Sequence, residues 1–273
     1  MYQNFDALDG KQARKLGLAS PLGQLFDHGI DCCLTTVYIM NFIIMFKIGQ
    51  SPFIFVYILF VNFIIFYFPN WSEYFTHILR TNSNNVGVTE IHLTVILMNM
   101  ASWFWGDSVW QNEWFLGLSC SSVFAIFLFI AILINIPPLF VESWKAAKGK
   151  DKENYMYMLI PIVTFFFSLF LAYVMLPQVF VVPSVSIVLM FCFTFNILTI
   201  KMITGSLTRM SYDILHIEVL AIYVTIFLIF IGFSENLIAV HALLVFARLI
   251  HLAVCIIFDI STYLKINVLT VPK

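Results

Sequence analysis

Four aspartates near the start of the chain form the strongest candidate for a chemical site. Asp6 and Asp9 are three residues apart, and Asp27 and Asp31 are four apart. The members of each pair would therefore share one face of a helix. Residues 15–21 between the pairs are rich in turn-forming types. They predict a tight reversal that brings two helix ends, and with them the four carboxylates, together.

Four carboxylates at close range repel one another unless cations lie among them. Oxygen-only ligation without cysteine suits Mg²⁺ or Mn²⁺ better than zinc. Two such ions could hold a diphosphate and stabilise charge on both the attacking and the leaving oxygens. The spacing excludes an EF-hand loop, whose ligands stand at alternate residues. The sequence thus predicts a site for hard divalent ions at Asp6, Asp9, Asp27 and Asp31.

Three more residues in the same segment suit the binding of a phosphorylated ligand. Arg14 follows Asp9 by little more than one helical turn, and its guanidinium can grip a phosphate through two parallel hydrogen bonds. Gly10 and Gly23 would let a ligand or another helix backbone approach closely, because neither has a side chain.

The composition shows which elements must position these residues. Hydrophobic residues make up 61% of the 273 residues and charged residues only 11%, with 30 Phe and a mean hydropathy of +0.94. A soluble chain carries about 25% charged residues, so we expect an all-α, polytopic transmembrane helix bundle. The net charge of −1 gives no basic footprint, which argues against a nucleic-acid partner.

Apolar runs long enough to cross a bilayer divide the chain into about eight spans. They lie near 28–49, 52–68, 88–106, 114–141, 156–176, 178–200, 214–233 and 237–258. The clearest breaks are expected at 69–74, 105–114, 142–155, 201–213 and 233–236. No internal repeat interrupts this pattern, so residues 1–273 are treated as a single membrane domain.

Lysine and arginine placement orients the predicted bundle. If the spans alternate in direction, most cations fall on one face: Lys11, Arg14, Lys15, Arg80, Lys145, Lys148, Lys150, Lys152, Lys201, Arg209, Lys265 and Lys273. Lys47 alone falls on the opposite face. The positive-inside rule makes the crowded face cytosolic. The aspartate-rich segment 6–31 would then face the cytosol.

The segment 6–31 reads D-x2-D-G-x2-A-R-x8-G-x3-D-x3-D. This pattern resembles the signature of the CDP-alcohol phosphotransferase family at every fixed position. Within this pattern, the segments LDGKQARK and SPLGQLFDHGID are similar to the choline/ethanolamine phosphotransferase branch of the family. Fainter similarity continues through Trp71-x2-Tyr74, Val88-Thr89-Glu90 and Ile266-Asn267-Val268.

The resemblance implies a specific reaction. Such enzymes transfer phosphocholine or phosphoethanolamine from CDP-choline or CDP-ethanolamine to diacylglycerol and release CMP. The resemblance also implies an endoplasmic reticulum or Golgi membrane and a homodimer. It leaves the choice between choline and ethanolamine open.

The resemblance further implies roles for individual residues. His28, between the third and fourth aspartates, would accept the proton of the attacking hydroxyl, which suits an imidazole near neutral pH. Glu90 would orient or assist that base. The same resemblance has Asp6, Asp9, Asp27 and Asp31 hold two Mg²⁺ ions, and Gly10, Arg14 and Gly23 line the CDP site.

Relatives carry one to two further spans before the aspartate motif, which leads to an alternative of a different class. In that alternative, the chain is a catalytically silent, shortened isoform that binds or regulates full-length partners. A lesser alternative is an Mg²⁺-dependent membrane prenyltransferase, although such sites use two separate aspartate-rich motifs. Ionisable residues inside the last span, His241, Arg248 and His251, are candidates for function or for lipid-facing roles.

Overall fold

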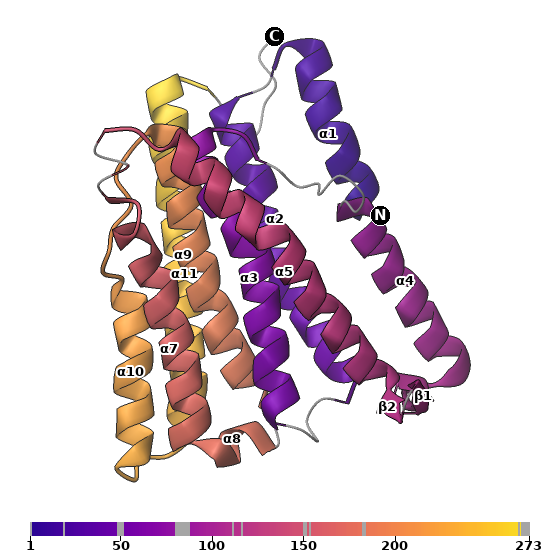
Figure 1. Cartoon of the computed structure of the whole chain (residues 1–273). Helices are drawn as coiled ribbons and strands as arrows, with labels where there is room; N and C mark the ends of the chain where they lie inside the picture. The colour runs from indigo at the N-terminus through magenta and orange to yellow at the C-terminus, as the bar shows by residue number, and fades with distance from the viewer. Residues whose placement is uncertain are drawn as a thin grey trace.

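Figure 1 shows the computed structural model, which describes residues 2–18, 20–47, 52–79, 88–110, 112–115, 117–149, 152, 154–181, 184–266 and 268. Its α-helices are α1 (Tyr2–Leu16), α2 (Pro21–Met45), α3 (Pro52–Thr76), α4 (Val88–Trp105), α5 (Cys120–Ala146), α7 (Ile160–Met175), α8 (Pro177–Val181), α9 (Val185–Thr208), α10 (Ile217–Phe230) and α11 (Asn236–Leu264). The 3₁₀ helices η2 (Asp107–Trp110) and η3 (Tyr157–Leu159) and the hairpin strands β1 (Glu113–Phe115) and β2 (Leu118–Ser119) complete the description.

The predicted all-α membrane bundle is confirmed. Within the described residues, six helices are long and apolar enough to cross a bilayer: α2, α3, α5, η3 with α7, α9 and α11. The apolar parts of α4 and α10, Leu93–Trp105 and Ile217–Phe230, are shorter. Each of the eight predicted spans thus corresponds to a helix, and successive long helices run up and down the bundle (Figure 1). The small β1–β2 hairpin, which lies between α4 and α5, was not predicted.

The turn between α1 and α2 is built as the sequence predicts. Gly17 ends α1 with φ +67°, a left-handed conformation that glycine adopts without steric cost. Pro21 stands in the first turn of α2, where its missing N–H costs nothing. The Ser20 hydroxyl caps α2 by accepting a hydrogen bond from the backbone N–H of Gly23 at 3.1 Å. The two halves of the aspartate motif therefore lie on consecutive helices of a helix–turn–helix.

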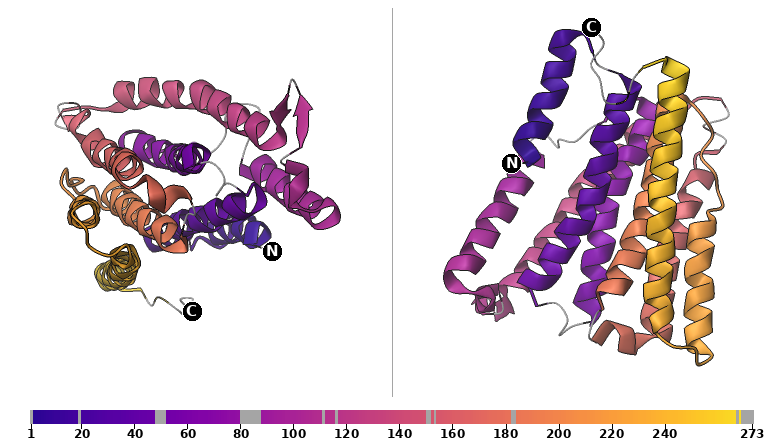
Figure 2. Two further views of the ribbon diagram at one scale, coloured as in Figure 1. Left: turned by 90° about the horizontal axis from the view of Figure 1, so that it is seen from below. Right: turned by 180° about the vertical axis from the view of Figure 1, so that it is seen from behind.

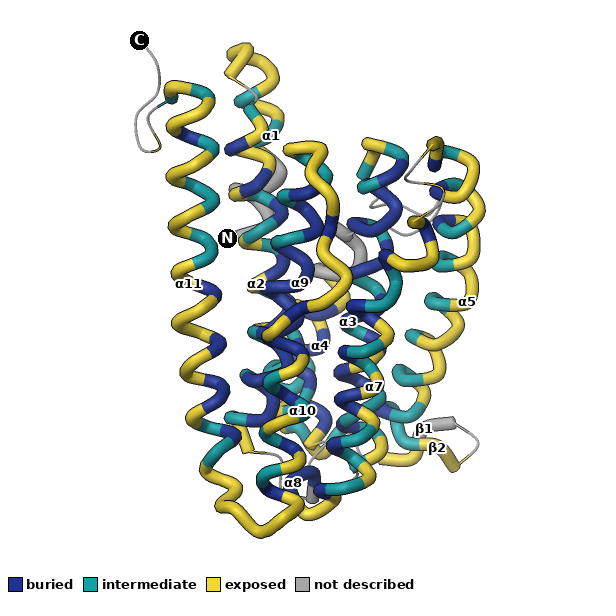
Figure 3. Tube along the Cα trace, turned by 90° about the vertical axis from the view of Figure 1, so that its left-hand side faces the viewer, coloured by how far each residue is buried: buried dark blue, intermediate teal, exposed yellow. Residues whose placement is uncertain are grey.

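α9 is the central helix of the bundle, and Figure 3 shows most of its length buried. Its Phe195 ring stacks on Phe63 of α3 at a centroid distance of 4.4 Å and lies 6.0 Å from Phe165 of α7. All three rings are fully buried. In a bilayer, apolar side chains gain little by leaving the equally apolar lipid, so helices associate mainly through close packing. Aromatic contacts of this kind contribute to that packing. Seen along the bundle, α4 lies at one edge while α10 and α11 lie at the other (Figure 2).

Two predicted breaks are wrong. Residues 69–74 continue α3 to Thr76, with Pro69 inside the helix. Residues 201–208 continue α9, so Lys201 lies within that helix and not in a loop. Packing against neighbouring helices outweighs the weak local signals of proline and polar residues. The predicted span 178–200 is also displaced, because α8 and α9 are separate helices.

The distribution of cations agrees with the alternation of the helices. The last turns of α1 and α5 carry Arg14, Lys15 and Lys145, and Arg209 and Lys265 follow α9 and α11. These helix ends lie at the top of the bundle in Figure 1. The start of α2 lies at the same end, so the candidate site is on the cation-rich side.

Candidate active site

A buried carboxylate, Glu73, lies against the first turns of α2. Its Oε2 is 3.7 Å from Nδ1 of His28, and its Oε1 accepts a hydrogen bond from the Gln24 amide at 3.0 Å. The side chains of His28 and Glu73 are only 10% and 7% exposed. Gln24 and His28 are one helical turn apart, so they present adjacent groups to the two oxygens of one carboxylate. Two helices distant in sequence thus meet at a single acidic side chain.

The burial of Glu73 has an energetic consequence. A carboxylate removed from water is unfavourable unless hydrogen bonds or an opposite charge compensate it. Here the Gln24 amide supplies the hydrogen bond, and the imidazole is the nearby group that can become positive. At 3.7 Å the Nδ1–Oε2 contact is longer than a hydrogen bond, and it places the carboxylate of Glu73 directly against the imidazole of His28.

The two aspartates of α2 flank His28. Asp27 and Asp31 are half-buried, and their i, i+4 spacing puts them on one side of the helix, next to the face that carries His28. Carboxylate oxygens are the ligands that Mg²⁺ and Mn²⁺ prefer. The donor set on α2 therefore fits a hard divalent cation.

The candidate phosphate-binding residues lie around the turn between the helices. In α1, the Arg14 guanidinium lies over Gly10, with Nη1 3.4 Å from where a β-carbon on Gly10 would stand. In α2, a β-carbon on Gly23 would lie 3.5 Å from Oγ of the capping Ser20. A β-carbon at Gly10 would thus be in van der Waals contact with the Arg14 guanidinium. The prediction that Gly10, Arg14 and Gly23 line a CDP site stays a prediction.

Three predicted site residues have side chains outside the described part of the structure. The backbones of Asp6 and Asp9 lie in α1, and that of Glu90 lies in the first turn of α4. Among the side chains that the structure describes, no three His, Cys, Asp or Glu groups are close enough to hold a metal ion. The four-aspartate metal site and the role of Glu90 remain predictions.

Glu73 was not among the residues predicted from the sequence. Residues 69–74 were interpreted as a break after a span, so an acid there looked solvated. The usable signal was the neighbouring pattern: Trp71 and Tyr74 are large aromatic residues at helical spacing, and Trp71 is fully buried. A helix that continues through these positions carries Glu73 into the bundle.

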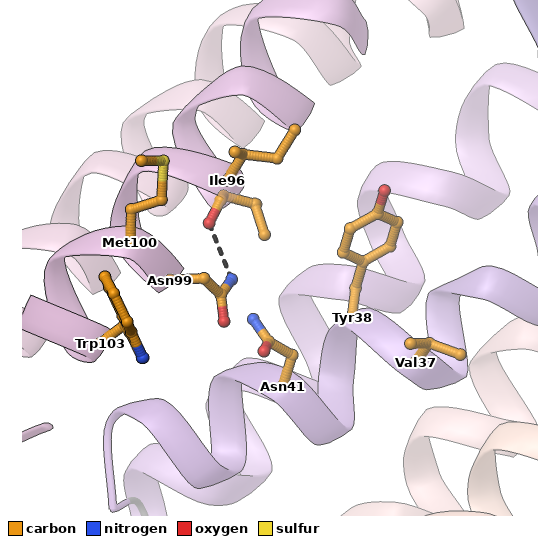
Figure 4. A pocket seen from close by; sticks show the side chains of 8 residues that line it. Val37, Tyr38, Asn41, Ile96, Asn99, Met100 and Trp103 are labelled. Atoms are coloured by element: carbon orange, nitrogen blue, oxygen red, sulfur yellow. Dashed lines mark hydrogen bonds between the residues drawn. The ribbon is translucent and has the colours of Figure 1, made fainter. Parts of the chain in front are cut away.

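A second feature of α2 is a cavity of about 540 Å³ between α2 and α4 (Figure 4). Its lining is mostly apolar: Val37, Tyr38, Asn41, Val95, Ile96, Asn99, Met100 and Trp103. Figure 4 shows Asn41 and Asn99 pointing toward one another from the two helices, while the Asn99 amide donates to the backbone carbonyl of Val95 at 2.8 Å. Tyr38 is ten residues beyond His28, or about 15 Å along the helix. The cavity thus lies further along α2 than the candidate active site, and it is open to the surface of the bundle, since Val37, Ile96 and Trp103 in its lining are exposed.

These features define a polytopic helical membrane protein with a histidine–carboxylate pair and flanking aspartates at the cation-rich end of its bundle. The chain belongs to the CDP-alcohol phosphatidyltransferase family, whose model matches residues 2–198. That match includes the aspartate motif, α3 with Glu73, and α4.

Several curated relatives share part of their sequence with this chain. The chain is 37% identical over 113 residues to cholinephosphotransferase 1 of Gallus gallus, which covers 41% of this chain and 33% of that protein. It is 37% identical over 111 residues to cholinephosphotransferase 1 of Homo sapiens, or 41% of this chain and 27% of that protein. An uncharacterised class-I family protein of Schizosaccharomyces pombe is 36% identical over 110 residues, or 40% and 28% of the two chains. The matched stretches thus span about a third or less of the length of these relatives.

Proposed function

We propose that this protein transfers a phosphoalcohol group from a CDP-alcohol to the free hydroxyl of diacylglycerol and releases CMP. The observation that carries the proposal is the buried contact of His28, which lies between Asp27 and Asp31 of the family motif, with Glu73 of α3. The hydroxyl oxygen would form a bond to the phosphorus next to the alcohol, and the bond from that phosphorus to the CMP oxygen would break. The CDP-alcohol would arrive from water and the lipid from the bilayer.

In this proposal, His28 accepts the proton of the attacking hydroxyl. Glu73 keeps the imidazole in place and stabilises the positive charge that the ring gains. Gln24 holds Glu73 through its amide hydrogen bond. Glu73 is thus a positioning residue, and Glu90 is proposed to assist the same base from the start of α4.

Divalent ions, Mg²⁺ or Mn²⁺, complete the proposed site. Asp27 and Asp31, with Asp6 and Asp9 from α1, would hold two of them. When bound, such ions neutralise the charge of a diphosphate and of the departing nucleotide. Arg14 would grip a phosphate of the CDP-alcohol, and Gly10 and Gly23 would allow it to approach the helices.

The cavity between α2 and α4 is a suitable place for an acyl chain of the lipid acceptor. It lies about 15 Å along α2 from His28, which is within the length of a fatty acyl chain. Its apolar lining would contact the chain while the hydroxyl stays at the level of His28. The lipid acceptor would then be held at its hydroxyl by the residues around His28 and at an acyl chain by the cavity.

Choline is the first headgroup to test, because the relatives described above are named cholinephosphotransferase; ethanolamine is the second. The cation-rich end of the bundle supports a cytosolic orientation of the site by the positive-inside rule. An endoplasmic reticulum or Golgi membrane is proposed from the resemblance, and so is a homodimer.

The proposal is tested by expressing the chain in cells that lack this activity. Microsomes would receive CDP-choline or CDP-ethanolamine with a labelled headgroup, together with diacylglycerol and Mg²⁺. Labelled phospholipid that is absent with His28→Ala supports the proposal. Equal product with and without His28 would refute it, and no product from a properly inserted chain would favour the silent, regulatory alternative.

A further inference from the structure

A second group of charged side chains, none of which belongs to the aspartate motif, lies between α9, α10 and α11. Glu218, at the start of α10, is 3% exposed. Both of its carboxylate oxygens lie 3.2 Å from Nζ of Lys201 in α9. Its Oε1 also lies 3.4 Å from Nε of Arg248 in α11. One carboxylate therefore binds two cations that come from different helices.

The charges in this group do not balance. Lys201, at 3.2 Å from both oxygens, is sufficient to neutralise Glu218, and its side chain is only 22% exposed. Arg248 adds a second positive charge, and its side chain is 45% exposed. The group thus carries one excess positive charge, located at the guanidinium that reaches the surface of the bundle.

Arg248 has hydrogen-bonding capacity beyond these contacts. Its Nε faces Glu218, and its Nη1 lies 3.2 Å from Nδ1 of His251 one turn further along α11. Among the described residues, Nη2 has no hydrogen-bond partner. A guanidinium in this position can present a pair of N–H groups to a phosphate oxygen.

The position of Arg248 inside a candidate membrane span, Asn236–Leu264, leads us to expect that the surface around it faces the bilayer and not the aqueous phase. α11 lies at an edge of the bundle (Figure 2), and Figure 3 shows it largely exposed along its length. Leu244, one turn before Arg248 on the same face of α11, is 66% exposed. Arg248 is twelve residues beyond Asn236, or about 18 Å from the start of the helix, within the roughly 30 Å of a hydrocarbon core.

An excess charge at such a depth is unfavourable unless an anion accompanies it. The same face of α11 continues toward the cation-rich end through His251, Cys255 and Asp259, all of which are exposed. This polar track connects Arg248 with the headgroup region. A lipid phosphate can therefore reach the guanidinium sideways while its acyl chains remain in the bilayer.

We propose that Arg248, with His251 beside it, binds the phosphodiester of one anionic phospholipid from the surrounding membrane. A lipid is the proposed source of the phosphate because the site opens onto an apolar face, which free phosphate does not enter. An anionic lipid carries one net negative charge and matches the excess charge of one, whereas a zwitterionic lipid has no net charge and would leave it uncompensated. This site is separate from the proposed catalytic residues.

The test uses the full chain in nanodiscs of phosphatidylcholine that contain a small fraction of spin-labelled phosphatidylglycerol. Electron paramagnetic resonance measures the fraction of label immobilised at the protein. We expect Arg248→Gln to weaken the selective binding of phosphatidylglycerol by about tenfold, the usual effect of losing a charge-assisted hydrogen bond. Glu218→Gln should strengthen it, because that change raises the excess positive charge to two.

The matched control is Arg209→Gln, which removes the same charge at the end of α9 and should leave the selectivity unchanged. The opposite effects at positions 248 and 218 separate lipid binding from loss of folding, since a fold defect would weaken binding in both variants. Unchanged selectivity with Arg248→Gln would overturn the proposal and leave Arg248 a structural ion-pair partner. An equal loss with Arg209→Gln would overturn it too, because general surface charge would then explain the binding.

Discussion

Oε2 of Glu73 lies 3.7 Å from Nδ1 of His28, although Glu73 is in the last turn of α3 and His28 is near the start of α2. The contact joins a residue of the family motif to an acid outside that motif. It also fixes the relative position of the two helices at the candidate site, because Gln24 binds the second oxygen of the same carboxylate. If the proposed function is correct, replacing Glu73 should change the kinetic constants of the enzyme.

Replacing Glu73 with Gln should lower kcat by roughly ten- to hundredfold. This is the range seen when a residue that orients a functional side chain is replaced. The amide keeps the shape of the side chain but no longer stabilises a positive imidazole. KM for the CDP-alcohol should change little, because Glu73 does not contact it in our proposal. Steady-state kinetics of the variant measure both constants.

Gln24→Ala provides the comparison for Glu73→Gln, since it removes the hydrogen bond to Glu73 but retains the carboxylate. Its effect on kcat should be the smaller of the two. A loss confined to KM in Glu73→Gln, or an unchanged kcat, would contradict the positioning role.

Removal of divalent ions should abolish transfer. EDTA would strip the ions proposed at Asp6, Asp9, Asp27 and Asp31, and the diphosphate would lose its charge compensation. Activity should return when Mg²⁺ is added in excess. Asp27→Asn should need a higher Mg²⁺ concentration for half-maximal activity than the parent chain, and full activity in EDTA would show that the oxygen ligands serve another purpose.

Filling the cavity between α2 and α4 should impair use of the lipid acceptor. Ile96→Trp places a large ring in the lining, so KM for diacylglycerol should rise by several fold while KM for the CDP-alcohol stays constant. Ile44→Trp is the control, because Ile44 is 69% exposed on α2 and does not line the cavity. Equal effects of the two variants would argue against an acyl chain in this cavity.

The aromatic contacts of α9 should be important for stability. Phe195→Ala removes a fully buried ring that touches Phe63 and Phe165, and such truncations cost about 3–5 kcal/mol. Phe258→Ala changes a ring that is 67% exposed on α11 and should have little effect. Thermal unfolding of the purified variants in one detergent compares the two; similar midpoints would mean that α9 does not organise the bundle.

Much of the fold was predictable because membrane spans have a strong sequence signal. Long apolar runs and the one-sided distribution of lysine and arginine gave the eight helices and their alternation. Helix ends were less predictable. The residues around Pro69 and Lys201 looked like loops, yet neighbouring helices bury them and extend α3 and α9 beyond the bilayer-length runs.

The candidate site, like the fold, was predictable only in part. That Asp27 and Asp31 share one side of a helix could be predicted from their spacing, because local geometry is fixed within a helix; His28 was predicted from the resemblance to the family. Glu73 could not, because its position depends on how α3 packs against α2. The ion pairs of Glu218 were missed for the same reason, since its two cations come from α9 and α11.

The central claim is most directly tested by comparing the parent chain with His28→Ala and Asp31→Ala in microsomes that lack this activity. The measured quantity is labelled headgroup transferred from CDP-choline or CDP-ethanolamine to diacylglycerol at equal levels of inserted protein. The account predicts metal-dependent product from the parent and a loss of at least about a hundredfold in either variant. Product at the parental rate from His28→Ala would contradict it.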